Sequence, residues 1–150
     1  MVPEKIMQVI ILLTLILIVM LIVMLIVKVT RRKGYMIKVY GEDKEKTVLK
    51  CLDWMGAHHL PCERLTNSNV DKEVVVDILK LSEGGFDDCV KSGYRAALNN
   101  FSFTEALNFI VENPNLLREP IIWNENKLVI GFQIDELTTF LPRGQRGQGI

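Results

Sequence analysis

Hydrophobic and polar positions divide the chain into two parts with different patterns. Between Ile6 and Val27 almost every residue is Ile, Leu, Val or Met, and only Gln8 and Thr14 interrupt the run. At ~1.5 Å per residue, a helix of roughly this length spans the ~30 Å hydrocarbon core of a bilayer. The pattern therefore predicts a hydrophobic, membrane-spanning helix within residues 1–35.

Residues 36–143 show the short alternating and helical patterns of a compact α/β domain. Apolar runs predict strands at residues 36–40, 62–65, 121–123 and 128–130. Apolar residues at helical spacing predict helices at residues 44–57, 72–81 and 103–112, short helix and loop at 86–98, and a closing helix with Ile134, Leu137, Phe140 and Leu141 on one face. Asp71 and Ser102 are predicted N-caps, and Glu105 completes a capping box with Ser102.

The last strand pair begins with a proline. Pro120 has no N–H to donate, so it can stand only at the beginning of a strand. The segments NPNLLREPII, KLVIGF, DEL and FLPR around this pair resemble the Spx and arsenate reductase (ArsC-like) family. The resemblance covers residues 36–143 and implies a thioredoxin-like α/β fold, a mixed sheet with flanking helices, in which the Glu119–Pro120 bond is cis.

The resemblance also indicates which chemistry is missing. The family's reactive cysteine lies five residues after the tyrosine of the first strand, and this position is Glu45 here. Val48 stands where a second cysteine would complete a C-x-x-C motif. A thiolate at a helix N-terminus is a nucleophile because the helix dipole lowers its pKa, and a glutamate cannot replace it. Glu45 is instead expected to stabilise the first turn of its helix.

A second position agrees with the first. Arsenate reductases of this type carry an arginine immediately before the cis proline, where it holds the oxyanion, whereas this chain has Glu119 before Pro120. Arg118 lies one residue earlier. We therefore expect no catalytic residues and a degenerate redox and anion site made of Glu45, Val48, Arg118, Glu119 and Pro120. The alternative is an arsenate reductase or glutaredoxin-like oxidoreductase.

The segment LKLSEGG, with Lys80, Glu83 and Gly85, matches a second functional region of the family. In the Spx branch this helix end and loop bind the C-terminal domain of the RNA polymerase α subunit, so the resemblance implies a transcription regulator without a disulfide switch. The competing interpretation is a charged surface residue followed by a helix-ending glycine. If Gly85 has φ below zero, Gly85→Arg should remove partner binding and leave the fold intact.

The remaining candidate ligands do not indicate a metal or cofactor. Cys51, Cys62 and Cys89 form no C-x-x-C and their number is odd, so a disulfide framework is not expected. His58 and His59 are adjacent, which points their side chains apart on a helix, and no second ligand pair follows at metal spacing. Cys51, Trp54 and Trp123 are expected in the core.

Net charge bears on partners and location. Residues 36–150 carry 13 basic and 17 acidic residues, once the five basic and one acidic residue of 1–35 are set aside, a net charge of −4. This charge disfavours sequence-specific DNA binding by the domain alone. Lys28, Arg31, Arg32 and Lys33 follow the apolar run, so the positive-inside rule places the domain in the cytoplasm, anchored to the inner membrane by a single span.

Three segments result: a hydrophobic segment at 1–35, the thioredoxin-like domain at 36–143, and a glycine-rich tail at 144–150 that we expect to be flexible. A membrane-tethered binding module is thus a further alternative. Another interpretation is that translation starts at Met36, because the codons for Arg31, Arg32 and Lys33 can form a purine-rich ribosome-binding tract. In that case the protein is cytoplasmic and has no membrane segment.

Overall fold

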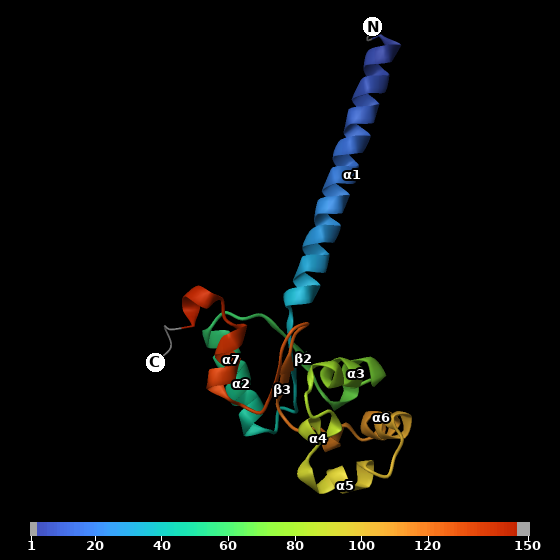
Figure 1. Cartoon of the computed structure of the whole chain (residues 1–150). Coiled ribbons are helices and arrows are strands. Elements are labelled where there is room, and N and C mark those ends of the chain that lie inside the picture. The colour runs from blue at the N-terminus through green and yellow to red at the C-terminus, as the bar shows by residue number, and fades with distance from the viewer. Residues whose placement is uncertain (1–2, 147–150) are drawn as a thin grey trace. The chain divides into compact units, whose positions relative to one another are not determined.

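The computed structural model describes residues 3–146, and for residues 30–35 it describes the backbone only. The chain divides into two compact units, Met1–Tyr35 and Met36–Ile150. The first consists of one long helix, and the second contains a four-stranded sheet with helices on both faces (Figure 1).

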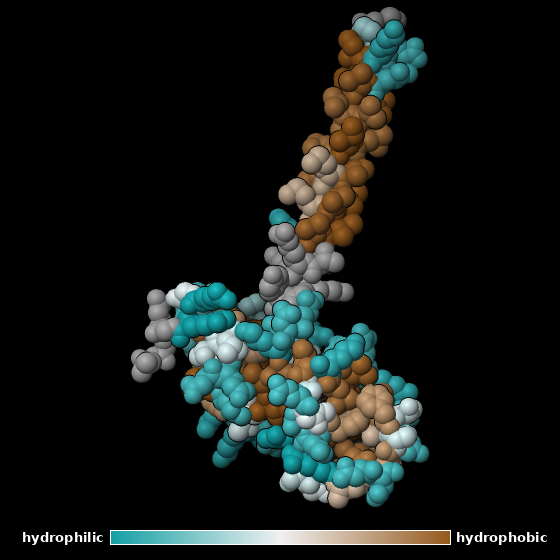
Figure 2. All heavy atoms as spheres, in the orientation of Figure 1, coloured by the Kyte–Doolittle hydropathy of each residue, from teal (hydrophilic) through white to brown (hydrophobic). Residues whose placement is uncertain are grey.

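The first unit is the continuous helix α1 (Glu4–Tyr35). Its large hydrophobic side chains between Ile6 and Val29 are 43–67% exposed, and they form the brown surface of this helix in Figure 2. Within the described residues, Glu4–Val29 is one helix that is long and apolar enough to cross a membrane.

The sheet of the second unit is mixed. Its strand order is β2 (Cys62–Leu65), β1 (Ile37–Tyr40), β3 (Ile121–Trp123) and β4 (Leu128–Ile130). β1 runs parallel to β2, whereas β3 is antiparallel to both β1 and β4. This arrangement, with helices on both faces, is the predicted thioredoxin-like fold.

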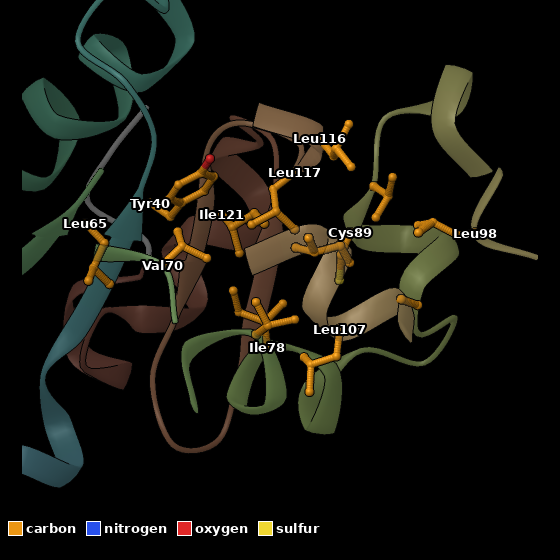
Figure 3. Close-up of a cluster of buried hydrophobic side chains, with 14 of the residues drawn as sticks. Tyr40, Leu65, Val70, Ile78, Cys89, Leu98, Leu107, Leu116, Leu117 and Ile121 are labelled. Carbon is orange, nitrogen blue, oxygen red and sulfur yellow. The ribbon is translucent and has the colours of Figure 1, made fainter. Parts of the chain in front are cut away.

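Alternation along the strands separates two hydrophobic layers. Ile122 faces one layer, in which Cys51 and Met55 of α2 (Lys46–Ala57) and Leu137 of α7 (Ile134–Leu137) are buried. Ile121 and Trp123 face the other layer, shown in Figure 3. That layer is covered by α3 (Lys72–Leu81), α4 (Phe86–Cys89), α5 (Arg95–Leu98) and α6 (Phe103–Glu112). Because side chains of a strand alternate between faces, three consecutive buried residues can supply both layers.

The predicted caps of two helices are confirmed. The Val74 backbone N–H donates to Asp71 Oδ1 at 2.9 Å at the start of α3. At the start of α6, the Glu105 N–H donates to Ser102 Oγ at 3.3 Å, and the Ser102 N–H donates to Glu105 Oε2 at 2.7 Å. Each such cap stabilises its helix by about 1 kcal/mol. Because few residue types provide such a cap, these helix starts could be predicted from the sequence.

Two predicted helices differ in detail. The first helix of the domain begins at Lys46 rather than at residue 44, and Glu45 is its N-cap residue with extended backbone angles. The closing helix is a short α7 followed by the 3-10 turn Thr138–Phe140, and Ile134 is 50% exposed rather than buried. In this closing segment Leu137 and Leu141 are buried, so not every apolar residue of the predicted helical pattern packs in the core.

The C-terminal segment is described as far as Arg146. Arg143–Gln145 forms a 3-10 turn, and the Arg146 guanidinium donates to the carbonyl oxygens of Leu141 at 3.0 Å and Thr139 at 3.1 Å. Residues 147–150 of the expected flexible tail lie outside the described residues.

Candidate functional site

The N-terminus of α2 is the position where the family resemblance expects a reactive thiol. Here the Glu45 carbonyl oxygen accepts the backbone N–H groups of Val48 at 3.1 Å and Leu49 at 3.2 Å. The Glu45 side chain makes no capping hydrogen bond. Glu45 therefore begins the helix through its backbone, and the sequence-based expectation that it lies inside the first turn is wrong by one residue.

Val48 is fully buried beneath the strand-to-helix turn. A Cβ atom added at Gly41 would lie 2.3 Å from Val48 Cγ2, so the glycine allows this close approach. The position of the family's second cysteine thus contributes an apolar packing contact. This contact fixes how the chain leaves β1 and enters α2.

Glu119 contacts the same turn from the other side. The peptide bond between Glu119 and Pro120 is cis, as predicted from the resemblance. Glu119 Oε1 accepts the Glu42 backbone N–H at 3.2 Å, and Glu42 Oε1 in turn accepts the Asn67 N–H at 2.7 Å. A carboxylate of the chain itself therefore occupies a backbone donor in the turn before α2.

Tyr40 lies beside this pair of carboxylates. Its hydroxyl oxygen is 2.6 Å from Asn67 Oδ1 and 2.8 Å from the Pro114 carbonyl oxygen, and its single proton serves one of these acceptors. Burial, with added repulsion from Glu119 and Glu42, raises the pKa of this hydroxyl. Negative charge next to a buried tyrosine makes this position unfavourable for an oxyanion.

Arg118 is separate from the other residues of the expected degenerate site. Its Nη1 donates to the Asp88 carbonyl oxygen at 3.2 Å, and its backbone N–H donates to the Cys89 carbonyl oxygen at 2.8 Å. Arg118 lines a groove with Ser82 and Glu83. In the structure this arginine binds α4, whereas Glu119 binds the turn before α2, so the expected grouping of Arg118 with Glu45, Val48, Glu119 and Pro120 is not what these contacts show.

Residues 80–85 comprise the end of α3 and the loop that joins it to α4, here called the 80–85 loop, and their shape depends on Asp88. Asp88 Oδ2 accepts the Gly84 backbone N–H at 2.7 Å and lies 3.1 Å from Ser82 Oγ, which is also 3.2 Å from the Gly85 carbonyl oxygen. Lys80, Glu83 and Gly84 are exposed, whereas Gly85 is half-buried. The loop is therefore a preformed surface feature between α3 and α4.

The two glycines of this loop have different requirements. A Cβ at Gly84 would lie 2.3 Å from Asp88 Oδ1, so a side chain there would displace the carboxylate that holds the loop. A Cβ at Gly85 would meet nothing within 4 Å, but its φ of +63° and ψ of −134° suit glycine alone. The condition of φ below zero does not hold, so Gly85→Arg would strain the loop as well as block a partner.

The cysteines and histidines occupy structural positions. Burial raises the pKa of the thiols of Cys51 and Cys89 to about 11, and it raises that of the half-buried Cys62. His58 stacks on Trp54 with ring centroids 4.2 Å apart at the end of α2. Within residues 3–146, no group of three or more His, Cys, Asp or Glu side chains could hold a metal ion.

Sequence reasoning missed the residues that organise both regions. Glu42, Asn67 and Asp88 each accept or donate a hydrogen bond that fixes a turn. The partners of Glu42 and Asn67 are far away in sequence, whereas Asp88 accepts from residues four and six positions before it. For Asp88 there was a faint signal, because an acid four residues after Gly84 can reach back to a loop N–H. No comparable signal linked Glu119 to Glu42.

Comparisons with known proteins agree with the fold. Residues 90–140 match the sequence profile of the ArsC family. An arsenate reductase from Vibrio cholerae superimposes with a TM-score of 0.52 at 13% identity, over 70% of this chain and 97% of that one. At this level of identity the match supports the fold alone.

Two streptococcal relatives are more similar in sequence. The global transcriptional regulator Spx of Streptococcus agalactiae is 32% identical over 107 residues, which cover 66% of this chain and 78% of that protein. The Spx regulator of Streptococcus pneumoniae is 35% identical, again over 66% of this chain, and over 80% of its own length. On this similarity, and on the mixed sheet with its cis proline, the chain belongs to the thioredoxin-like Spx and ArsC family.

Proposed function

We propose that this protein is an Spx-type transcription regulator that binds the C-terminal domain of the RNA polymerase α subunit through residues 80–85. The relatives described above are global transcriptional regulators, and this is the function that the proposal transfers. Lys80, Glu83 and Gly85 are the residues we expect to contact the polymerase.

The shape of the 80–85 loop is the observation that carries the proposal. Asp88 holds the loop from inside the domain, so its exposed atoms need little ordering when a partner binds. A preorganised loop loses less conformational entropy on binding than a flexible one. Gly84 also has no side chain, which leaves its backbone accessible to a partner.

We further propose that the protein carries out neither thiol catalysis nor the family's disulfide switch. Glu45 and Val48 occupy the two positions where that chemistry needs cysteine, and the Glu119 carboxylate takes a backbone donor in the adjacent turn. Cys51 and Cys89 are buried and hold their protons at neutral pH. These features disfavour an arsenate reductase or a glutaredoxin-like oxidoreductase.

The proposed location is the cytoplasmic face of the inner membrane. A helix whose large apolar side chains are exposed from Ile6 to Val29 is stable in a bilayer and would aggregate in water. The basic residues that follow it favour a cytoplasmic domain. A membrane-tethered binding module without a role in transcription is the second candidate function, and this helix favours it.

Binding to the purified α C-terminal domain tests the proposal. The full chain, solubilised in a mild detergent, should bind, and Lys80→Glu should weaken binding by an amount that shrinks as salt rises. Lys50→Glu is the matched control, because Lys50 is an exposed lysine on α2, on the opposite face of the sheet. Absence of wild-type binding, or equal affinity of both variants, would contradict the proposal.

A further inference from the structure

A groove lies next to the 80–85 loop. It has a volume of about 510 Å³ and is lined by Ser82 and Glu83 of the loop, by Leu128 and Ile130 of β4, by Arg118, and by Glu136 of α7. β4 is an edge strand of the sheet, with β3 as its neighbour. The groove is therefore continuous with the surface proposed to contact the polymerase.

The charges of the groove are unbalanced. Glu83, Asp88 and Glu136 contribute three carboxylates, against one guanidinium from Arg118. Asp88 already accepts the Gly84 N–H, and Arg118 donates to the Asp88 carbonyl oxygen. Within the described residues, the carboxylates of Glu83 and Glu136 have no hydrogen-bond or ion-pair partner.

Within the described residues, the nearby cations form no ion pair with Glu136. Lys127 and Arg146 border a shallower hollow that Glu136 also lines. Both direct their donors to the carbonyl oxygen of Thr139, Arg146 at 3.1 Å. Glu136 thus remains available to a positive charge from outside.

The apolar part of the lining completes the pattern. Leu128 and Ile130 are two residues apart on β4 and therefore lie on the same face of the strand. Both are half-buried. An aliphatic stem can pack against them while its charged end reaches the carboxylates, which is how lysine and arginine side chains bury on protein surfaces.

We propose that this groove binds a protruding lysine or arginine side chain of the partner protein, with its cation between Glu83 and Glu136 and its stem against Leu128 and Ile130. The inference rests on the proposed function, because it takes the partner to be the α C-terminal domain. It adds the chemistry that the loop alone does not supply, a selective site for a basic side chain beside Lys80.

Neighbouring acids on α7 provide a matched test. Asp135 and Glu136 are both exposed and both lie in the first turn of this short helix, but only Glu136 lines the groove. Glu136→Lys should lower the affinity of the full chain for the purified α C-terminal domain about tenfold, because a charge attraction becomes a repulsion. Asp135→Lys should change affinity less than about twofold.

Lys80→Glu, measured in parallel, separates the two proposals. If Lys80→Glu weakens binding while Glu136→Lys matches Asp135→Lys, the groove does not hold a cation and the inference is overturned, although the proposed function stands. If the wild type does not bind at all, both are overturned. A selective loss with Glu136→Lys, in a variant whose thermal unfolding matches that of Asp135→Lys, supports the groove as a binding site for a basic side chain.

Discussion

Asp88 illustrates how one carboxylate can determine a binding surface. It accepts the Gly84 N–H and the Ser82 hydroxyl, while its own carbonyl oxygen is held by Arg118. Asp87, the preceding residue, is exposed, and its side chain makes no hydrogen bond within the described residues. Two neighbouring acids of the same type therefore have different roles.

The first prediction follows from this difference. Asp88→Ala should lower the free energy of unfolding by about 1–3 kcal/mol, because it leaves loop donors without acceptors. Asp87→Ala should stay within about 0.5 kcal/mol of the wild type. Urea unfolding of both variants measures this, and equal stability of the two would show that Asp88 does not hold the loop.

Any other residue at position 85 would strain the backbone. With φ at +63° and ψ at −134°, Gly85→Ala should cost about 1–3 kcal/mol of stability although a Cβ has open space there. Gly93→Ala is the control, since that glycine also has open space and no positive φ. In thermal unfolding, the midpoint temperature should fall more for Gly85→Ala than for Gly93→Ala. The reverse order would contradict the loop geometry.

Buried thiols make stability depend on alkaline pH. The pKa of Cys51 and Cys89 rises from 9.0 to about 11 in the folded chain. Between these values the unfolded chain loses protons that the folded chain keeps, so stability that is complete below about pH 9 declines towards pH 11.

Urea unfolding at about pH 8 and about pH 10.5 should therefore show a lower free energy at the higher pH. The double variant Cys51→Ala, Cys89→Ala should lose less over this interval, although Tyr40 still contributes in the same direction because its pKa is also raised. Stability that is unchanged or increases over the interval in the wild type would argue against buried, protonated thiols.

Among the helices and strands, sequence predicts best where the signal is local. The caps at Asp71 and Ser102 and the apolar spacing of α3 and α6 lie within a few residues of the structure that they cause. The short strands were also predicted from sequence, because their residues follow short apolar or alternating patterns. The apolar spacing did not predict the start of α2, the exposure of Ile134 or the positive φ of Gly85. Gly85 lies in a loop whose shape is set by hydrogen bonds of Ser82 and Asp88, which an apolar pattern does not contain.

The candidate site shows the same limit. The resemblance pointed to Glu45 and Val48, and the structure has Glu45 as the N-cap of α2 and Val48 in its first turn. It did not separate Arg118 from Glu119. These two adjacent residues have different partners: Arg118 donates to a carbonyl oxygen of α4, and the Glu119 carboxylate accepts from the turn before α2.

The N-terminus of α2 leads to a prediction about catalysis. The full chain should show no thiol-dependent reduction of arsenate, because Glu45 replaces the nucleophile. Glu45→Cys alone should remain inactive, since the Glu119 carboxylate still occupies the turn and repels an oxyanion. An assay of arsenite formation measures this, and turnover by the unmodified chain above a no-enzyme control would contradict it.

For the whole chain, α1 leads to a prediction about membrane association in cells. The protein expressed from Met1 should sediment with membranes and resist extraction by high salt, because burying α1 in lipid is strongly favourable. The double variant Leu13→Arg, Leu17→Arg should be found largely outside the membrane fraction. Each arginine near the helix centre makes the free energy of membrane insertion less favourable by about 2.5–3.5 kcal/mol.

Leu49→Arg is the control for this experiment. Leu49 is a leucine of α2 that is 44% exposed, compared with 61% and 60% for Leu13 and Leu17. It should leave membrane association unchanged. Full release of the wild type by salt would exclude the membrane-spanning role of α1.

The central proposal is that the polymerase contacts the 80–85 loop and does not contact the turn and helix start at residues 41–48, where the family's redox cysteines would lie. Hydrogen–deuterium exchange of the full chain with and without the α C-terminal domain tests this directly, because it reports protection segment by segment. Slower exchange confined to residues 80–88 and to α7, with residues 41–48 unchanged, is the expected result. Protection centred on residues 41–48, or no protection anywhere, would contradict the proposal.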